Sequence, residues 1–197
     1  MNQMGMMVDV SHSGEKTFWD VIETSSKPII ASHSCVYALA PHVRNLKDEQ
    51  IKAIAKNGGL IGINFYAGYL DKDFDNKFSQ LRMSAMAHLD SMKEQFGQDV
   101  AGYRKYQQKY YLNLCRDIRP DVGRLVDHME YIINLVGDDY VGLGSDFDGM
   151  SVPPRGLDDV SYLPEITRIM LERGFNRQRI FKILGGNFMR VFNAVQP

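Results

Sequence analysis

The sequence predicts an α/β fold with a parallel sheet, because short apolar runs alternate with amphipathic helical stretches along the chain. Each run is nearly continuous, as is typical of parallel strands that are covered on both faces. Four such strands are half the number found in a closed (β/α)₈ barrel. The count therefore favours half a barrel, with predicted strands at Gly5–Val10, Pro28–Ser32, Gly59–Phe65 and Tyr140–Gly144.

Amphipathic helices are predicted between these strands and after the last of them. Capping residues mark some of their ends: Asn57-Gly58 closes the second helix, and Asn176 is the N-cap of the last one. Such alternation of strands and helices builds parallel α/β sheets. The predicted helices cover residues 13–27, 48–56, 121–136, 163–173 and 176–192.

The connection between the third and fourth predicted strands is too long for a simple crossover. Its residues 71–119 are polar, rich in Tyr, Gln and Lys, and helical in pattern. We interpret them as a helical insertion into a single domain that spans residues 1–197, since no internal repeat or low-complexity segment divides the chain.

Composition excludes several classes of protein. The 197 residues contain 23 Lys and Arg against 24 Asp and Glu, so no global charge favours nucleic acid. No apolar run approaches the roughly 18 residues of a membrane span. Cys35 and Cys115 lie far apart, which excludes a disulfide scaffold. The first residues lack the features of a secretory signal and run directly into a strand, so we expect that the chain begins inside a fold and leave its compartment open.

Polar side chains follow the carboxyl end of each predicted strand, where α/β enzymes keep their chemistry. Neutral imidazole binds zinc and similar metals, and a nearby carboxylate can move protons for a metal-bound water. A structural role in hydrogen bonding remains open for both strand-end histidines. The strand-end residues are His12, His33, Asn64, Tyr66, Asp146 and Asp148.

Other notable residues receive simpler interpretations. We expect the remaining histidines, His42, His88 and His128, to lie at the surface, because they fall in a loop or on helical stretches. Cys35 is interpreted as a small buried residue, although it lies close to His33. Arg44 is, by its pattern alone, an ordinary solvated charge.

Several motifs occur in a fixed order and carry a resemblance. They are Val8-Asp-Val-Ser-His12-Ser, Pro28-Ile-Ile-Ala-Ser-His33-Ser, Arg44-Asn45, Asn64-Phe-Tyr66 and Gly144-Ser-Asp146-Phe-Asp-Gly149. Together they strongly resemble the membrane (renal-type) dipeptidase family of zinc peptidases, family M19. The C-terminal segments Gly156–Ser161 and Gly186–Phe192 also resemble it, so that most of the chain outside residues 71–119 is covered.

The resemblance implies a function and roles for individual residues. It implies a zinc-dependent dipeptidase that hydrolyses dipeptides by a metal-activated water, on a (β/α)₈ barrel of the metal-dependent hydrolase kind. His12 and His33 would be ligands of the second of two zinc ions. Arg44 would bind the C-terminal carboxylate of the substrate, with Tyr69 lining the same end. Asp146 would contact the free amino end and handle protons.

Departures from the family pattern are equally informative. The His-x-Asp pair for the first zinc and the glutamate that bridges both metals are not found in this sequence. The chain therefore resembles strands five to eight, the C-terminal half of the barrel, and we expect it to hold metal weakly and to turn over substrate poorly alone. The alternative is a non-catalytic half-barrel that retains the ligand pocket. A metal-free α/β hydrolase is disfavoured because no GxSxG motif is present.

Half a barrel also has consequences for assembly. Four strands leave one apolar face of the sheet partly uncovered and two edges open. Burial of one large aliphatic side chain contributes about 1.5–3 kcal/mol, so this surface should be covered either by a second copy of the chain or by residues 71–119. We expect a homo-oligomer, because residues 71–119 are too polar to cover an apolar face well. The residues expected to lack partners are Met6, Val8, Val10, Ile30, Ile61, Ile63, Val141 and Leu143.

Overall fold

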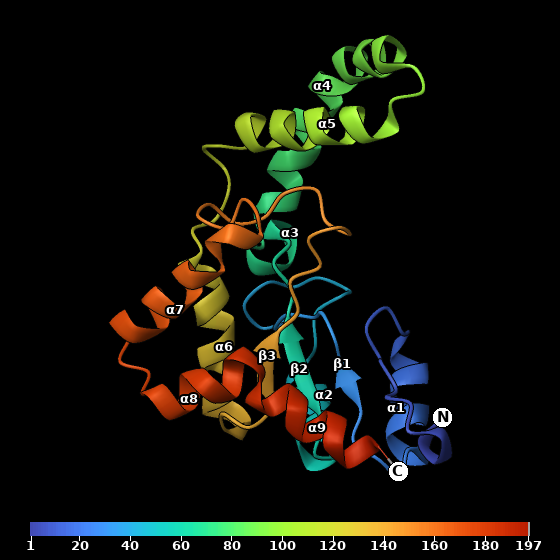
Figure 1. Ribbon diagram of the computed structural model, residues 1–197, viewed down its shortest axis with the longest axis vertical. Coiled ribbons are helices and arrows are strands. Elements are labelled where there is room, and N and C mark those ends of the chain that lie inside the picture. The colour runs from blue at the N-terminus through green and yellow to red at the C-terminus, as the bar shows by residue number, and fades with distance from the viewer. Residues whose placement is uncertain (197) are drawn as a thin grey trace.

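A small parallel sheet lies at the centre of the molecule (Figure 1). The computed structural model describes residues 1–196. Three strands, β1 (Ile30–Ala31), β2 (Leu60–Ile63) and β3 (Val141–Leu143), pair in the order β1-β2-β3, with both pairs parallel. The chain is thus an α/β protein, as predicted, although helices make up most of it.

The first predicted strand, Gly5–Val10, is not a strand in the structure. It forms a single parallel bridge between Asp9 and Ile30, with hydrogen bonds from Ile30 N to Val8 O (2.9 Å) and from Val10 N to Ile30 O (2.8 Å). Pairing stops there because the Ser32 N–H, the next donor of a parallel ladder, donates to Asp9 Oδ1 (3.0 Å). An aspartate side chain has replaced the backbone acceptor.

The predicted helices are confirmed with shifted ends, and one is interrupted. Asn176 caps its helix as predicted, with Arg179 N donating to its Oδ1 (2.9 Å). The last helix is divided by a π-helical segment, Lys182–Gly186, which ends in two glycines. The helices are α1 (Glu15–Thr24), α2 (Asp48–Lys56), α6 (Gly123–Val136), α7 (Leu163–Glu172), α8 (Arg177–Phe181) and α9 (Asn187–Val195), with short 3₁₀ helices at Asn2–Met4 and Val160–Tyr162.

The two faces of the sheet are covered by different helices. One face packs against α2 and α6, with α7 packed on α6, and Ile61, Ile63 and Val141 are fully buried there. On the other face, α9 places Val191 and Val195 against Ile30 and Leu60. Because helices cover both faces of the sheet, apolar residues occupy consecutive positions in each strand.

The expectation that one face of the sheet is partly uncovered is therefore wrong for most of the residues named. Val10 and Ile30 are also buried, and of that set Met6 is the one classed as exposed. The reason is that α9 folds back over the second face. The exposed apolar surface lies instead on the outer side of α9 and the segment before it: Phe181, Leu184, Phe188, Met189 and Phe192.

Residues 71–119 contain two long antiparallel helices, α4 (Phe74–Phe96) and α5 (Val100–Leu114), which extend away from the sheet (Figure 1). The short helix α3 (Ala67–Leu70) connects β2 to them. The pair has its own apolar cluster, separate from the main core, built on Phe74, Phe78, Ala85, Leu89, Tyr111 and Cys115. Together with Ala67 and Val152, this cluster fixes the helical pair above the carboxyl ends of the strands.

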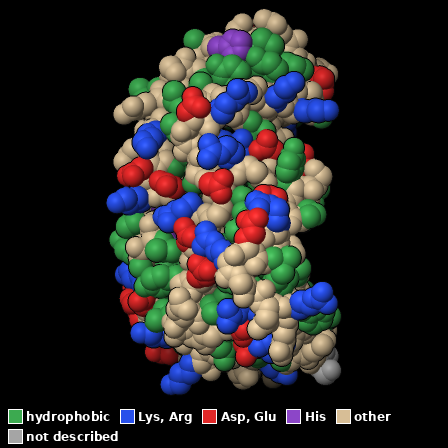
Figure 2. Space-filling model, turned by 90° about the vertical axis from the view of Figure 1, so that its left-hand side faces the viewer, with side chains coloured by type: hydrophobic (Ala, Val, Ile, Leu, Met, Phe, Trp, Pro, Cys, Tyr) green, Lys and Arg blue, Asp and Glu red, His purple; other side chains and the backbone are tan. Residues whose placement is uncertain are grey.

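Acidic and basic side chains are interspersed over the face drawn in Figure 2. This distribution agrees with the near-zero net charge and shows no large patch of one sign on that face. Among residues 1–196, no helix combines the length and the apolar character that crossing a membrane would require.

Candidate functional site

The strand-end histidines lie side by side. The ring centroids of His12 and His33 are 5.0 Å apart, with an angle of 57° between the ring planes. His12 follows the segment that bridges to β1, and His33 follows β1 itself, so the two segments bring both imidazoles to one end of the sheet. They are close enough to share a ligand.

A short relay of hydrogen bonds orients the His33 ring. Ser32 Oγ donates its hydrogen to Asp9 Oδ2 (2.5 Å), so it can only accept from His33 Nδ1, 2.7 Å away. His33 therefore carries its hydrogen on Nδ1 and keeps a lone pair on Nε2, which is the arrangement of a metal-binding imidazole. The backbone is fixed as well, because His33 N donates to Ser11 Oγ (3.0 Å).

The electrostatic environment keeps this imidazole neutral. Burial lowers the pKa of His33 most, while Asp146 opposes the shift and Arg44 reinforces it. A neutral ring is the form that binds a metal.

Backbone conformation marks two residues of this region. Within residues 1–196, His12 (φ 68°) and Asp146 (φ 57°) are the non-glycine residues with positive φ. Such conformations cost free energy and collect at functional sites. Asp146 is further held by Asn64, whose Nδ2 donates to Asp146 Oδ2 (3.1 Å). Asn64 is one of the predicted strand-end residues.

Arg44 faces the same region from the loop that precedes α2. Its Nη2 lies 3.5 Å from His33 O, and its Cζ lies 5.6 Å from the centre of the Tyr69 ring. Burial raises the pKa of Tyr69, and the adjacent guanidinium opposes that rise. Arg44 Nε is buried and has no hydrogen-bond partner within residues 1–196. The interpretation of Arg44 as a solvated charge is wrong, because Tyr69 and the His33 backbone enclose it.

A cavity of about 500 Å³ adjoins these residues, and its walls include His12, His42 and Arg44. This volume lies within the range of small-molecule sites, roughly 300–1,000 Å³. A larger cleft of about 960 Å³ lies between α5 and the loop after β3, beside Tyr111 and Phe147.

Two histidines expected at the surface are not there. His42 is half-buried, its ring is 4.6 Å from that of Tyr69, and its Nδ1 accepts from Arg44 N (3.1 Å). His128 is fully buried. Its spacing from Leu125 and Ile132 on the apolar face of α6 was a signal that could have revealed this. His88 is exposed, as predicted, and Cys35 is buried, as predicted.

Asn45, which follows Arg44 in the sequence, has a structural role that its motif does not predict. Its Oδ1 accepts from Cys35 N (3.2 Å), and its Nδ2 donates to Tyr69 O (2.8 Å). The side chain therefore ties the loop after β1 to α3. No spacing rule predicts this, because the partners are brought together by tertiary structure.

The metal-binding capacity of the described residues is limited. Residues 1–196 contain no group of three or more His, Cys, Asp or Glu side chains placed to hold one ion. His12 and His33 fit two coordination positions, whereas zinc sites in proteins are usually four-coordinate. Asp9 is engaged by Ser11 N and Ser32.

Comparison with known proteins places the chain in a family. The family model described as membrane dipeptidase, peptidase family M19, matches residues 1–197. The chain belongs to this family. One curated protein similar to this chain is dipeptidase tcpJ of Claviceps purpurea. It is 34% identical over 196 residues, which are 100% of this chain and 36% of that protein. A Klebsiella pneumoniae protein, described as an uncharacterized protein in the pqqA 5′ region, is 32% identical over 99% of this chain and 57% of its own length.

Solved structures agree with the family assignment. A metallopeptidase from Rhodobacter sphaeroides, liganded with a phosphinate mimic of the dipeptide L-Ala-D-Ala, gives a TM-score of 0.74 at 27% identity, over 98% of this chain and 44% of that one. The probable dipeptidase PvdM from Pseudomonas aeruginosa gives 0.75 at 28% identity, over 99% and 52%. This M19 chain therefore has the α/β fold of its relatives and spans between about a third and three fifths of their length.

Proposed function

We propose that this M19 chain forms the C-terminal half of a (β/α)₈ barrel and contributes the dipeptide-binding part of a zinc dipeptidase site. The observation that carries the proposal is the meeting of His12, His33, Arg44 and Asp146 at one end of a parallel sheet. These residues come from segments far apart in the sequence, and two of them adopt positive φ. The solved relatives named as metallopeptidase and dipeptidase support the same function.

Arg44 is the residue suited to the carboxylate end of a dipeptide. A guanidinium offers parallel donors that match the two oxygens of a carboxylate. The side chain lines the cavity of about 500 Å³, so a carboxylate bound there can approach the guanidinium. Tyr69 lies against the guanidinium and restricts its position.

Asp146 is suited to the opposite end of the substrate. Its Oδ2 accepts from Asn64 Nδ2 (3.1 Å), and the negative charge of the carboxylate suits an ammonium group. In hydrolysis of the peptide bond, Asp146 would contact the free amino end, take up a proton from the attacking water and transfer it to the leaving nitrogen.

His12 and His33 are the proposed zinc ligands. Zinc, when bound, supplies a Lewis acid for the peptide carbonyl and for water. The chain's own contribution is to hold one imidazole with a free Nε2 by the Asp9–Ser32 relay, next to the second imidazole. With two ligands from these residues, binding by this chain alone is expected to be weak.

A second function is favoured by one observation. Since residues 1–196 hold no group of three metal-ligating side chains, a non-catalytic half-barrel that binds dipeptides without cleaving them also agrees with the structure. Both functions use Arg44 and Asp146 to bind the dipeptide, and they differ in whether the dipeptide is cleaved.

Titration calorimetry with Zn²⁺ and with L-Ala-D-Ala tests the proposal. We expect weak zinc binding that is lost in His12→Ala and in His33→Ala. His88→Ala is the matched control, because His88 is exposed on α4. Zinc binding that is unchanged in both site variants would contradict the assignment of the ligands.

A chromatographic assay for released alanine separates the two functions. Slow release that requires zinc and is lost in Asp146→Asn supports catalysis. Binding of the dipeptide with no release supports the binding module. Turnover as fast as that of a full-length M19 relative would contradict the expectation that this chain is impaired alone.

A further inference from the structure

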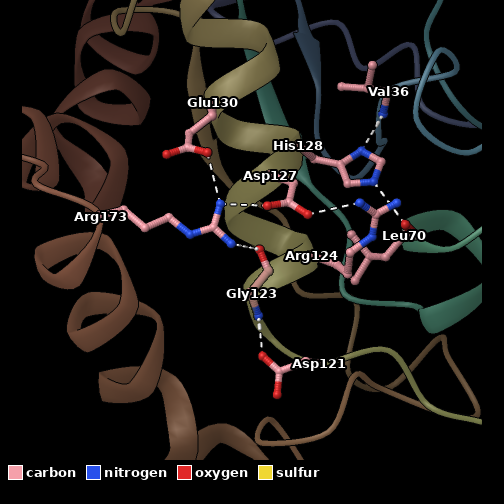
Figure 3. A network of polar contacts seen from close by, with 9 residues as sticks. All are labelled: Val36, Leu70, Asp121, Gly123, Arg124, Asp127, His128, Glu130 and Arg173. Carbon is pink, nitrogen blue, oxygen red and sulfur yellow. Dashed lines mark hydrogen bonds and ion pairs between the residues drawn. The ribbon is translucent and has the colours of Figure 1, made fainter.

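His128 bonds two separate segments of the site from the middle of α6. It is fully buried, with Val36 on one side of its ring and Leu70 on the other (Figure 3). Val36 N donates to Nδ1 (3.0 Å), so the ring hydrogen lies on Nε2, which donates to Leu70 O (3.1 Å). Both ring nitrogens are therefore satisfied by backbone groups in a single neutral tautomer.

The two backbone partners belong to the segments that carry the proposed carboxylate site. Val36 lies between His33 and Arg44, in the loop after β1. Leu70 directly follows Tyr69 in α3. Since Arg44 and Tyr69 are held face to face, their spacing depends on how this loop and α3 are fixed to each other.

Asn45 forms a parallel link between the same segments. It accepts from Cys35 N and donates to Tyr69 O, whereas His128 accepts from the next amide, Val36 N, and donates to the next carbonyl, Leu70 O. Two buried side chains thus connect consecutive amides of the loop to consecutive carbonyls of α3.

The helix that carries His128 is itself firmly anchored. Asp127 accepts from Arg124 (2.9 Å) and from Arg173, the residue that follows α7 (2.5 Å), and Glu130 also pairs with Arg173 (2.9 Å) (Figure 3). Arg173 also donates to Gly123 O at the start of α6. The outer side of α6 is held by α7, which leaves the inner side as a fixed platform for the ring.

We propose that His128 is a positioning residue, which bonds Val36 and Leu70 and thereby sets the spacing of Arg44 and Tyr69 for recognition of a dipeptide carboxylate. The inference rests on the proposed function, because it assigns His128 to the same site. Burial lowers the pKa of His128 to about 4, so the neutral ring that makes both bonds persists at neutral pH.

Two variants separate the two bonds. His128→Asn places an amide oxygen near the position of Nδ1 and keeps an acceptor for Val36 N. His128→Gln extends an amide donor toward Leu70 O. Tyr131→Phe is the matched control on α6, because it removes a hydrogen bond to Asp48 (2.9 Å) of α2 and leaves both hydrogen-bonding nitrogens of His128 in place.

Calorimetry with L-Ala-D-Ala and with its C-terminal amide measures recognition of the carboxylate. We expect the wild type to prefer the acid, and each His128 variant to lose about tenfold of that preference, which corresponds to about 1.4 kcal/mol. Zinc binding should change little, because Ser11 and Ser32 hold His33 independently. Tyr131→Phe should leave both quantities unchanged.

Each result is decisive. A preference for the acid that is unchanged in both His128 variants overturns the positioning role. Equal losses of zinc and dipeptide binding overturn it too, because they indicate general loss of structure. A wild type without preference for the acid refutes the proposed function and this inference together. Amide hydrogen exchange can be measured on the wild type and does not depend on whether a variant folds. Rapid exchange of the Val36 amide hydrogen would overturn the proposed link between Val36 and His128.

Discussion

Substitution of Arg44 by lysine isolates the contribution of the guanidinium fork. Lysine keeps the positive charge and much of the contact with Tyr69, but it is a point charge on a flexible stem. Arg44 is half-buried and lines the cavity of about 500 Å³. The change therefore removes geometry while it preserves charge.

The magnitude follows from the number of hydrogen bonds. A fork makes two bonds with a carboxylate, and lysine at the same place makes about one. One bond to a charged group contributes about 1.5–3 kcal/mol. At 1.4 kcal/mol for each factor of ten, Arg44→Lys should weaken the binding of L-Ala-D-Ala by about 10- to 150-fold.

Calorimetry with the dipeptide and with its C-terminal amide is the assay. Wild type should bind the acid more tightly than the amide, and Arg44→Lys should lose most of that difference. Arg168→Lys is the matched control, since Arg168 is exposed on α7 and pairs with Glu165 and Glu172. Equal weakening of acid and amide would refute the reasoning, because Arg44 would then act through the fold and not through the carboxylate.

Three further predictions concern stability and assembly. His128 has a pKa of about 4 when folded and about 6.5 when unfolded, so between these values the unfolded chain binds a proton that the folded chain excludes. Urea unfolding should show a loss of about 3 kcal/mol from this group between pH 7 and pH 4, and His128→Gln should lack that component; identical pH profiles would contradict it. Gly144→Ala should destabilise the fold by about 1–3 kcal/mol in the same assay, because its Cβ would collide with Ser32 O, and wild-type stability would exclude that close approach. In sedimentation equilibrium the chain should form a homo-oligomer that Phe188→Gln weakens, since Phe188 belongs to the exposed apolar surface of α9. A monomer throughout the micromolar range would contradict this.

Local chemistry made much of the fold predictable. Apolar continuity located β1, β2 and β3, and helical periodicity located α1, α2, α6 and α7, because these signals depend on neighbouring residues alone. The failure at Gly5–Val10 has an equally specific cause. The Asp9 side chain takes the N–H of Ser32, a contact over 23 positions that no local pattern contains.

The same division applies to the candidate site. The sequence by itself determined that His12, His33 and Asp146 follow apolar runs, and parallel strands bring such residues to one edge. Only the tertiary structure decided that Arg44 is enclosed by Tyr69 and that the buried ring of His128 bonds the backbone of two site segments. The physical reason is that burial and hydrogen-bond partners depend on segments far apart in the chain, whose approach is fixed by the packing of α6 and α9 and not by spacing along the sequence.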